Sequence, residues 1–321
     1  MSWDCVLTTN GTLSMLHRFV DNARAMGCHH IHVHHDAPAR ASPLVADDVT
    51  NIICDADYWQ HQHGNRPESI EERQLINATR AWRDSRADWM LSCDLDEHVW
   101  HPGDGNSLNM WLDSLPLDVQ TVQVLPIEAI YAAQPANEDD IFATPFFKSI
   151  HAPWRSKVFW REHGRPADLV DLQERGFWGH TAGKSFTRTG IPDIVQLPLH
   201  EHTTTPEGRS LGHVFARAAR LRHYDCLPLE AWTRKHVDRI EGRSIAARMG
   251  GRRKKIARHI SRLLHDQGLP GLAGLHRDMY CPPAEAIAAG LEAGLIVEVP
   301  PKPPTTPAAA PAPGREPAGE S

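Results

Sequence analysis

The sequence has no apolar run that approaches the roughly 20 residues of a membrane-spanning helix, so no membrane segment is predicted. It also has no Cys-x-x-Cys pair. Its 6 cysteines are far apart, which argues against a zinc ribbon and against a disulfide framework. The opening residues have neither the basic start nor the apolar core of a signal peptide. Because free thiols suit a reducing compartment, these absences together predict a cytoplasmic protein.

A strong charge of one sign is missing as well. The formal net charge is −6 over 321 residues, too weak to favour binding to nucleic acid, and we expect no nucleic-acid partner. Apolar residues make up 41% of the chain, which is ordinary for a globular protein. The length is enough for one large domain or two ordinary ones with a sizeable core.

The first hundred residues alternate between extended and helical patterns. Apolar, β-prone runs end in turn signals, and the segments between them place apolar residues at helical spacing. The predicted order is strand 5–9, helix 13–27, strand 30–36, strand 49–55, helix 67–87 and strand 88–94. This alternation predicts an α/β fold with a mostly parallel mixed sheet flanked by helices.

The pattern changes after residue 105. Extended segments are predicted at 119–132, 146–150, 156–160 and 184–189. From residue 206 the pattern becomes helical, with predicted helices at 212–224, 228–242, 252–268 and 282–298. The Pro/Ala-rich end at 300–321 has no core-forming residues and is predicted to be a disordered tail.

Three acids stand together where the strand at 88–94 stops: Asp94, Asp96 and Glu97. Asp94 and Asp96 are two positions apart, so in an extended segment they share a face, where they repel unless a positive charge lies between them. A divalent metal removes this conflict, and oxygen ligands select Mg²⁺ or Mn²⁺. Ligands of open parallel sheets bind beyond the carboxyl ends of the strands. The cluster therefore predicts a metal site that holds a diphosphate, with a solvated acidic turn as the alternative.

The segment ADWMLSCDLDEHVW resembles the DxD segment of family-2-like glycosyltransferases with the GT-A fold. It is closest to the branch with a D-x-D-E centre and a later H-Y pair followed by Lys. Further segments resemble parts of that family in the same order: CVLTTNG, MGCHHIHVHHDAP, ERQLINATRA, AGKSFTRTG, LPLHEH and LRHYD. The resemblance covers roughly residues 3–240.

The resemblance implies a domain organisation. A GT-A-like catalytic domain spans 1–225, with a nucleotide-binding half at 1–105 and an acceptor half at 106–225. A helical C-terminal extension follows at 226–299, before the tail. The implied activity is metal-dependent transfer of a sugar from a UDP- or GDP-linked donor to a hydroxyl acceptor, in surface glycan or polysaccharide synthesis.

The resemblance also implies roles for individual residues. Asp94 and Asp96 bind the metal and the diphosphate of the donor, and Asp96 and Glu97 belong to the catalytic centre. His223 corresponds to the late histidine that completes metal coordination, and His200 is its rival. The candidate contacts with the nucleotide and its phosphates are Thr8, Asn10, Asp36, Arg73, Lys184 and Lys235.

The base that removes the acceptor proton has no single candidate. Inverting transfer needs a carboxylate or similar group in that role. The choice stays open among Glu201, Asp171, Asp168 and Glu162, of which Glu201 is carried forward as the catalytic candidate.

Two other functions compete with the transferase. CDLDEHV also resembles the nucleophile loop of haloacid-dehalogenase phosphohydrolases, but that loop normally opens the fold and His98 stands where a threonine is expected. A binding module that kept the fold and lost the chemistry is the other alternative, because Gly11 replaces the acid that follows Asn10 in the family.

Three further patterns allow a functional reading beside a structural one. His30, His32 and His34 share a strand face and could bind zinc, but packing of that face explains them better. The basic segment 250–264 could touch a membrane surface, although a helix with a solvated charged face is favoured. A group of tryptophans could bind sugar or cover the core: Trp59, Trp154, Trp160 and Trp178.

Overall fold

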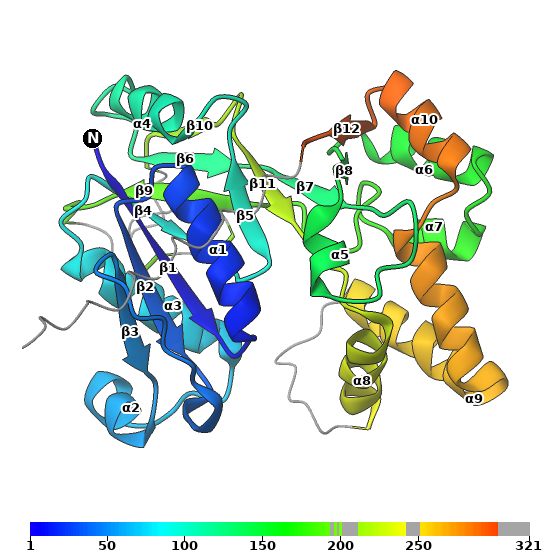
Figure 1. Ribbon diagram of the computed structural model, residues 1–321, viewed down its shortest axis with the longest axis horizontal. Coiled ribbons are helices and arrows are strands. Elements are labelled where there is room, and N and C mark those ends of the chain that lie inside the picture. Colours follow the sequence, from blue (N-terminus) through cyan, green and yellow to red (C-terminus); the bar gives the residue numbers. More distant parts are fainter. Residues whose placement is uncertain (193–195, 198, 201–210, 242–250, 301–321) are drawn as a thin grey trace, which may run out of the picture.

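The computed structural model describes residues 1–192, 196–197, 199–200, 211–241 and 251–300. It confirms an α/β fold, with a 7-stranded mixed sheet flanked by helices and a helical C-terminal segment (Figure 1). The first elements are β1 (Trp3–Thr9), α1 (Leu13–Ala25), β2 (His30–His35), η1 (Pro38–Arg40), β3 (Val49–Ile53), α2 (Ala56–His63), α3 (Ile70–Asp84), β4 (Trp89–Ser92) and β5 (Glu97–Trp100). The strands and helices expected in this region are all present.

The middle and end of the chain contribute elements to both sheets. They are α4 (Gly105–Asp113), β6 (Thr121–Val124), β7 (Pro126–Ala129), α5 (Glu138–Ala143), β8 (Phe146–Lys148), α6 (Pro153–Glu162), α7 (Ala167–Leu172), β9 (Lys184–Arg188), β10 (His213–Phe215), β11 (Arg220–His223), α8 (Leu229–Ile240), α9 (Gly251–Tyr280), α10 (Ala284–Glu292) and β12 (Ile296–Glu298). Gly268 has a positive φ of 64° and divides α9 into two helical segments.

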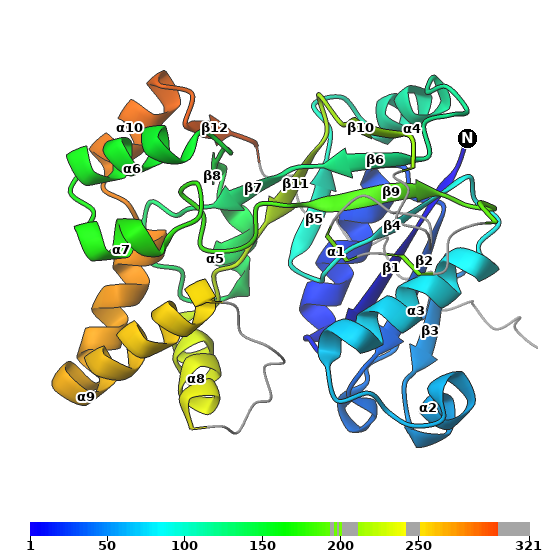
Figure 2. The same ribbon diagram turned by 180° about the vertical axis from the view of Figure 1, so that it is seen from behind.

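The larger sheet has the strand order β10-β6-β9-β4-β1-β2-β3. Its neighbours pair in parallel except β9, which runs antiparallel to both β4 and β6. Cys5 and Leu7 of β1 pack on the side of α1, whereas Val6 packs with α3 through Ala78 and Trp82. Central strands covered on both faces are apolar on both sides for this reason. Figures 1 and 2 show α1 on one face of this sheet and α3 on the other.

A second sheet, with the order β12-β8-β7-β11-β5, lies beside the first. The predicted strand at 119–132 is in fact two strands: β6 belongs to the first sheet and β7 to the second. β5 also enters the second sheet, where it pairs antiparallel with β11. The chain therefore passes from one sheet to the other directly after β4, at Asp94 and Asp96.

Three secondary-structure predictions are wrong. Residues 156–160 are helical, in α6, because Pro153 starts the helix and Ser156, Phe159 and Trp160 are buried on one face at helical spacing. Residues 212–224 contain β10 and β11 instead of a helix, since both pair with distant strands. The end of the predicted helix 282–298 is β12, which pairs with β8.

The helical C-terminal part packs against the second sheet. Ile260, Leu272 and Tyr280 of α9 share a core with Trp232 of α8. The apolar side of the basic segment contributes to the same core through Ile256, Leu263 and Leu264. None of the helices in the described part of the chain combines the length and the apolar character that crossing a membrane requires. Residues 301–321, most of the predicted tail, lie outside the described residues.

Candidate metal and nucleotide site

The turn between β4 and β5 carries the acidic cluster. The side chains of Asp94 and Asp96 are 30% and 35% exposed, whereas Leu95 between them is buried. Glu97 is fully buried and closes the turn: its Oε2 accepts the backbone N–H of Asp94 at 2.9 Å, and its own N–H donates to the Asp94 carbonyl at 3.0 Å. Two acids thus face outward at the edge of the sheet while the third holds the turn.

A buried lysine neutralises part of this cluster. Lys184, from β9, places Nζ 2.9 Å from Asp94 Oδ2 and 3.3 Å from Glu97 Oε2. The other oxygen of Asp94 accepts from Gln74 Nε2 of α3 at 2.6 Å. Both oxygens of Asp94 are therefore occupied by protein donors. Lys184, expected to neutralise phosphate, instead lies beneath the acids with only 2% of its side chain exposed.

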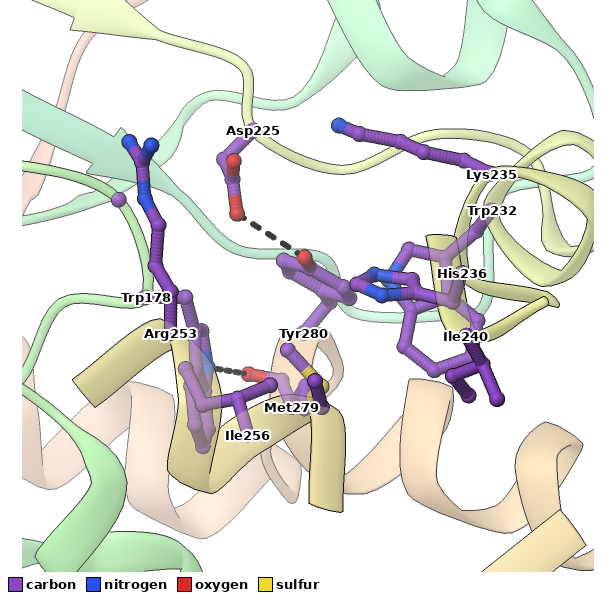
Figure 3. Close-up of a pocket in the computed structure, with 12 residues that line it drawn as sticks. Trp178, Asp225, Trp232, Lys235, His236, Ile240, Arg253, Ile256, Met279 and Tyr280 are labelled. Atoms are coloured by element: carbon purple, nitrogen blue, oxygen red, sulfur yellow. Dashed lines mark hydrogen bonds between the residues drawn. The ribbon is translucent and has the colours of Figure 1, made fainter. Parts of the chain in front are cut away.

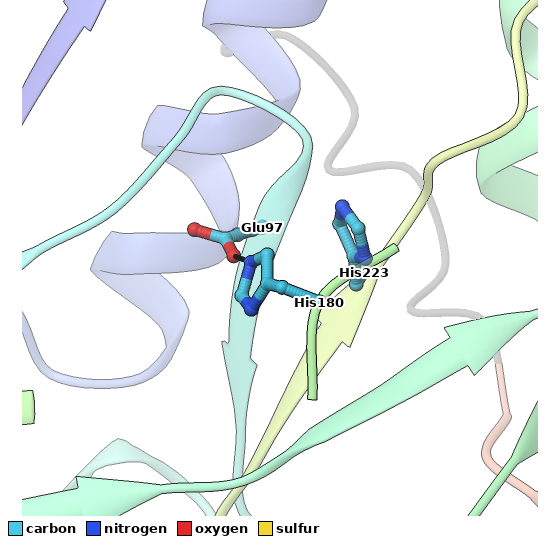
Figure 4. A group of neighbouring side chains, drawn as sticks. All are labelled: Glu97, His180 and His223. Atoms are coloured by element: carbon cyan, nitrogen blue, oxygen red, sulfur yellow. Dashed lines mark hydrogen bonds and ion pairs between the residues drawn. The ribbon is translucent and has the colours of Figure 1, made fainter. Parts of the chain in front are cut away.

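His180 also binds Glu97. Its Nε2 lies 2.7 Å from Glu97 Oε1 (Figure 4). Its Nδ1 lies 3.4 Å from the backbone nitrogen of Gly183. Because the N–H of Gly183 can only donate, Nδ1 accepts and Nε2 carries the proton that is donated to Glu97. Glu97, His180 and His223 bring ligand atoms within 4.8 Å of one another, and they form the one such group among the residues that the structure describes. Within this group, Glu97 and His180 already form a hydrogen bond with each other.

His223 faces Asp96 from the end of β11. Its Nε2 lies 4.0 Å from Asp96 Oδ2, and the neighbouring Tyr224 N–H donates to the Asp96 carbonyl at 2.9 Å, which ties β11 to the turn. His223 Nδ1 is buried without a hydrogen-bond partner among the described residues. Gly179 leaves room for this ring: a Cβ at Gly179 would lie 2.3 Å from His223 Cε1.

The charges of these two residues depend on each other. Although 35% of the Asp96 side chain is exposed, its partial burial and the carboxylates of Asp94 and Glu97 outweigh the charge of His223 and raise the pKa of Asp96 to about 6. Burial disfavours the charged form of His223, but the carboxylates of Asp96 and Asp225 outweigh it and raise the pKa of the imidazole above its ordinary value. Two groups that compete for protons at such a short distance are suited to share a cation instead.

The geometry of Asp96 and His223 fits a divalent ion. Ligand bonds to such ions are about 2.1 Å long, so a single ion reaches two ligand atoms that are up to about 4.2 Å apart. The 4.0 Å between Asp96 Oδ2 and His223 Nε2 lies inside that limit. A carboxylate oxygen with an imidazole nitrogen is a donor set that Mn²⁺ accepts. Asp94, also expected to be a ligand, would first have to release Lys184 or Gln74.

The rival histidine lies next to His180. The rings of His200 and His180 have centroids 4.3 Å apart, and no described contact joins His200 to Asp96. Burial, with the positive charge of Lys184, lowers the pKa of His200 to about 4, so it is neutral at pH 7. Glu201, the carboxylate expected to be catalytic, lies outside the described residues.

The expected nucleotide contacts lie at the carboxyl ends of β1 and β2. Thr8 accepts from Asn77 Nδ2 at 2.9 Å, and Asn10 is exposed. Asp36 is buried and forms a two-pronged ion pair with Arg73, whose Nε and Nη2 lie 2.7 and 2.8 Å from its two oxygens. Asp36 and Arg73, expected to contact different parts of the nucleotide, therefore hold each other.

A hollow of about 590 Å³ lies beside Asp36, at the carboxyl ends of β2 and β3. It is lined by Trp59 and by Arg66, whose Nη2 is 3.1 Å from Asp36 Oδ1 and whose side chain is 48% exposed. Arg66 was not identified from the sequence, where it stands in a polar loop without a motif. Its exposure makes it better placed than Arg73 to meet a phosphate.

The remaining base candidates lie elsewhere. Asp171 is exposed and pairs with Lys157 and Arg161, and Asp168 lies 3.8 Å from His259. They belong to α7, and Glu162 is exposed at the end of α6. Figures 1 and 2 place both helices at the opposite side of the molecule from β1 to β4.

The histidine row and the tryptophans singled out from the sequence are explained by packing. His34 is fully buried, and burial lowers its pKa to about 3, so it is a neutral core residue. His30 and His32 stack edge to face, and His32 lies 3.8 Å from Asp4. The four tryptophans do not form one cluster. Trp59 lines the hollow beside Asp36, and Trp154 is 70% exposed. Trp160 and Trp178 are buried, and both pack against the guanidinium of Arg165.

Comparison with known proteins adds little. No protein-family model matches the chain, and no protein with a curated description matches it. Among solved structures, the one titled "Crystal structure of HddC from Yersinia pseudotuberculosis" is similar at 13% identity with a TM-score of 0.29, over 68% of this chain and 92% of that chain. A similarity this weak supports no statement about function.

Proposed function

We propose that the protein is a metal-dependent glycosyltransferase that moves a sugar from a UDP- or GDP-linked donor to a hydroxyl acceptor, in surface glycan or polysaccharide synthesis. The observation that carries the proposal is the approach of Asp96 to His223. The two residues come from a turn and a strand far apart in the sequence and meet where β4 of the open sheet ends. The resemblance to glycosyltransferases in short motifs favours Asp96 and His223 as metal ligands, and the contact between them favours the same pair.

The roles of the individual residues follow from their contacts. Asp96 and His223 would hold Mn²⁺ or Mg²⁺, and when bound the ion offsets the negative charge that develops on the leaving diphosphate. Lys184 and Gln74 bind the two oxygens of Asp94 beside them. Glu97 holds the turn that orients Asp96. Thr8, Asn10 and Arg66 are then the candidates for contacts with the nucleotide.

Calorimetry with the full chain tests this proposal. Mn²⁺ and either UDP or GDP are titrated into the unaltered protein and into Asp96→Asn and His223→Asn. We expect nucleotide binding that depends on Mn²⁺ and is lost in both variants. Asp84→Asn is the matched control, because Asp84 is a 65% exposed carboxylate at the end of α3.

Two outcomes would support the competing functions instead. Hydrolysis of a generic phosphate ester that is lost in Asp94→Asn would favour a phosphohydrolase, in which Asp94 is the nucleophile. Binding of a glycan without any Mn²⁺-dependent binding of UDP or GDP would favour a binding module without transfer activity.

A further inference from the structure

A cavity of about 190 Å³ lies between α8, α9 and the end of β11 (Figure 3). One water needs roughly 10–15 Å³ of such space, so the cavity has room for a small organic molecule. Its walls contain three large aromatic side chains, three charged side chains and a histidine: Trp178, Trp232, Tyr280, Asp225, Lys235, Arg253 and His236.

The charges around this cavity do not balance. Asp225 Oδ2 accepts from the Tyr280 hydroxyl at 3.0 Å, which fixes the carboxylate in the wall. Lys235 and Arg253 reach toward the same side as Asp225 from α8 and α9, as Figure 3 shows. Among the residues that the structure describes, neither Lys235 nor Arg253 forms a salt bridge with a carboxylate. Two cations beside one carboxylate favour a ligand with a negative group.

The aromatic walls favour a ring with polar edges. Trp178 donates its indole N–H to the Met279 carbonyl at 2.7 Å, so its ring is held in place. Trp232 is 1% exposed and packs against His236, with ring centroids 4.5 Å apart, so it supports the wall from behind. An aromatic face suits the apolar C–H surface of a sugar, whereas a carboxylate suits its hydroxyls.

We infer that this cavity binds a sugar that carries a negative group, a carboxylate or a phosphate, and that under the proposed function this sugar is the acceptor. The cavity adjoins the Asp96–His223 pair: Gly179 lines it and touches His223, and the charge of Lys235 acts on both Asp96 and Asp225. An acceptor in the cavity would thus lie beside the ion and the donor diphosphate. The identity of the acceptor rests on the proposed function, whereas binding of the sugar does not.

The test uses glucuronate, glucose 6-phosphate and glucose as probes, measured on the full chain by saturation-transfer NMR and calorimetry without metal. We expect both anionic probes to bind and glucose to bind at least about tenfold more weakly, since a charge-assisted hydrogen bond contributes that much. Lys235→Ala and Arg253→Ala should each weaken the anionic probes by about tenfold and leave glucose unchanged.

Each variant has a neighbour as its control. Arg234→Ala changes a cation on the same helix as Lys235 whose side chain is 68% exposed and lies outside this cavity, so probe binding should stay unchanged. Lys254→Ala, next to Arg253 and exposed, should behave in the same way.

Several results would overturn the inference. They are the absence of binding by both anionic probes, equal losses in the control and test variants, or inorganic phosphate binding as tightly as glucose 6-phosphate while glucuronate does not bind. Asp96→Asn separates the two proposals, because it should lose Mn²⁺-dependent nucleotide binding and keep binding of glucuronate. If the anionic sugars fail to bind while the nucleotide still does, only the cavity assignment falls.

Discussion

Replacing Lys184 by methionine perturbs the charge that makes the acidic turn possible. Lys184 is the cation between Asp94 and Glu97, and Glu97 has no exposed surface. Methionine has a similar length and no charge, so the substitution removes the ion pair while filling the same space. The buried carboxylate of Glu97 then keeps His180 as its one side-chain partner among the described residues.

The expected loss of stability is large because a buried charge is left without its counter-ion. Removing one partner of a buried ion pair costs about 3–5 kcal/mol in the free energy of unfolding. Lys157→Met is the matched control, since Lys157 and its partner Asp171 are 42% and 52% exposed. An exposed pair contributes about 0–1 kcal/mol, so the control should stay within that range.

The loss should also depend on pH. Burial favours the neutral form of Glu97, but Lys184 and His180 outweigh it and hold the pKa of this carboxyl below its ordinary value. In the unaltered protein Glu97 therefore contributes stability above its unfolded pKa, and this is lost as the pH falls. Without Lys184, burial raises the pKa, and the folded state gains stability as the carboxyl takes up a proton. The difference between the two proteins should shrink from pH 7 to about pH 4.5.

Urea unfolding followed by tryptophan fluorescence measures the effect at pH 7 and pH 4.5. The double variant Lys184→Met/Glu97→Gln should recover part of the stability at pH 7, because it removes the stranded charge. A Lys184→Met protein as stable as the unaltered one at pH 7, or a double variant no more stable than the single one, would refute this account of the turn.

Three further predictions concern the positions around the site. Gly179→Ala should weaken Mn²⁺ binding, measured by calorimetry, by about 10-fold or more, because the new Cβ would displace the ring of His223. Gly274→Ala is the control: no atom lies near its Cβ position, so Mn²⁺ binding should stay unchanged. Arg73→Lys should lower the free energy of unfolding in urea by about 2 kcal/mol, since lysine cannot bind both oxygens of Asp36. Arg66→Lys should cost less than about 1 kcal/mol in the same assay, because the Arg66 side chain is 48% exposed and its charge is kept. Mn²⁺ affinity should fall as the pH drops below the raised pKa of His223, and more steeply below the Asp96 pKa of about 6, because protons then occupy both ligands, and an affinity that is flat between pH 7 and pH 5 would count against this pair of ligands.

The first half of the fold could be predicted because its pattern is local. Central parallel strands such as β1 are apolar on both faces, and α1 and α3 carry apolar stripes between clear caps. In the second half, distant pairing overrides the local pattern. Residues 213–215 and 220–223 look helical by themselves, yet they complete ladders with β6, β7 and β5.

In the site, too, local features could be predicted from the sequence, whereas contacts between distant residues could not. The sequence places Asp94 and Asp96 at a strand end, and the repulsion between them predicts a nearby positive charge. It does not show which cation supplies that charge, because Lys184 comes from β9, 90 residues away from Asp94. His180 and Gln74 have no motif of their own, so only the folded chain reveals that they bind the acids. Asp36 and Arg73 were both identified, but their mutual ion pair depends on how α3 packs beside β2.

The central claim is that Asp96 and His223 hold one divalent ion between them. A crystal of the protein soaked in Mn²⁺ and diffracted at the manganese absorption edge tests this most directly. The account predicts an anomalous peak about 2.1 Å from both Asp96 Oδ2 and His223 Nε2. A peak bound only by Glu97 and His180, or no peak beside Asp96 at millimolar Mn²⁺, would contradict it.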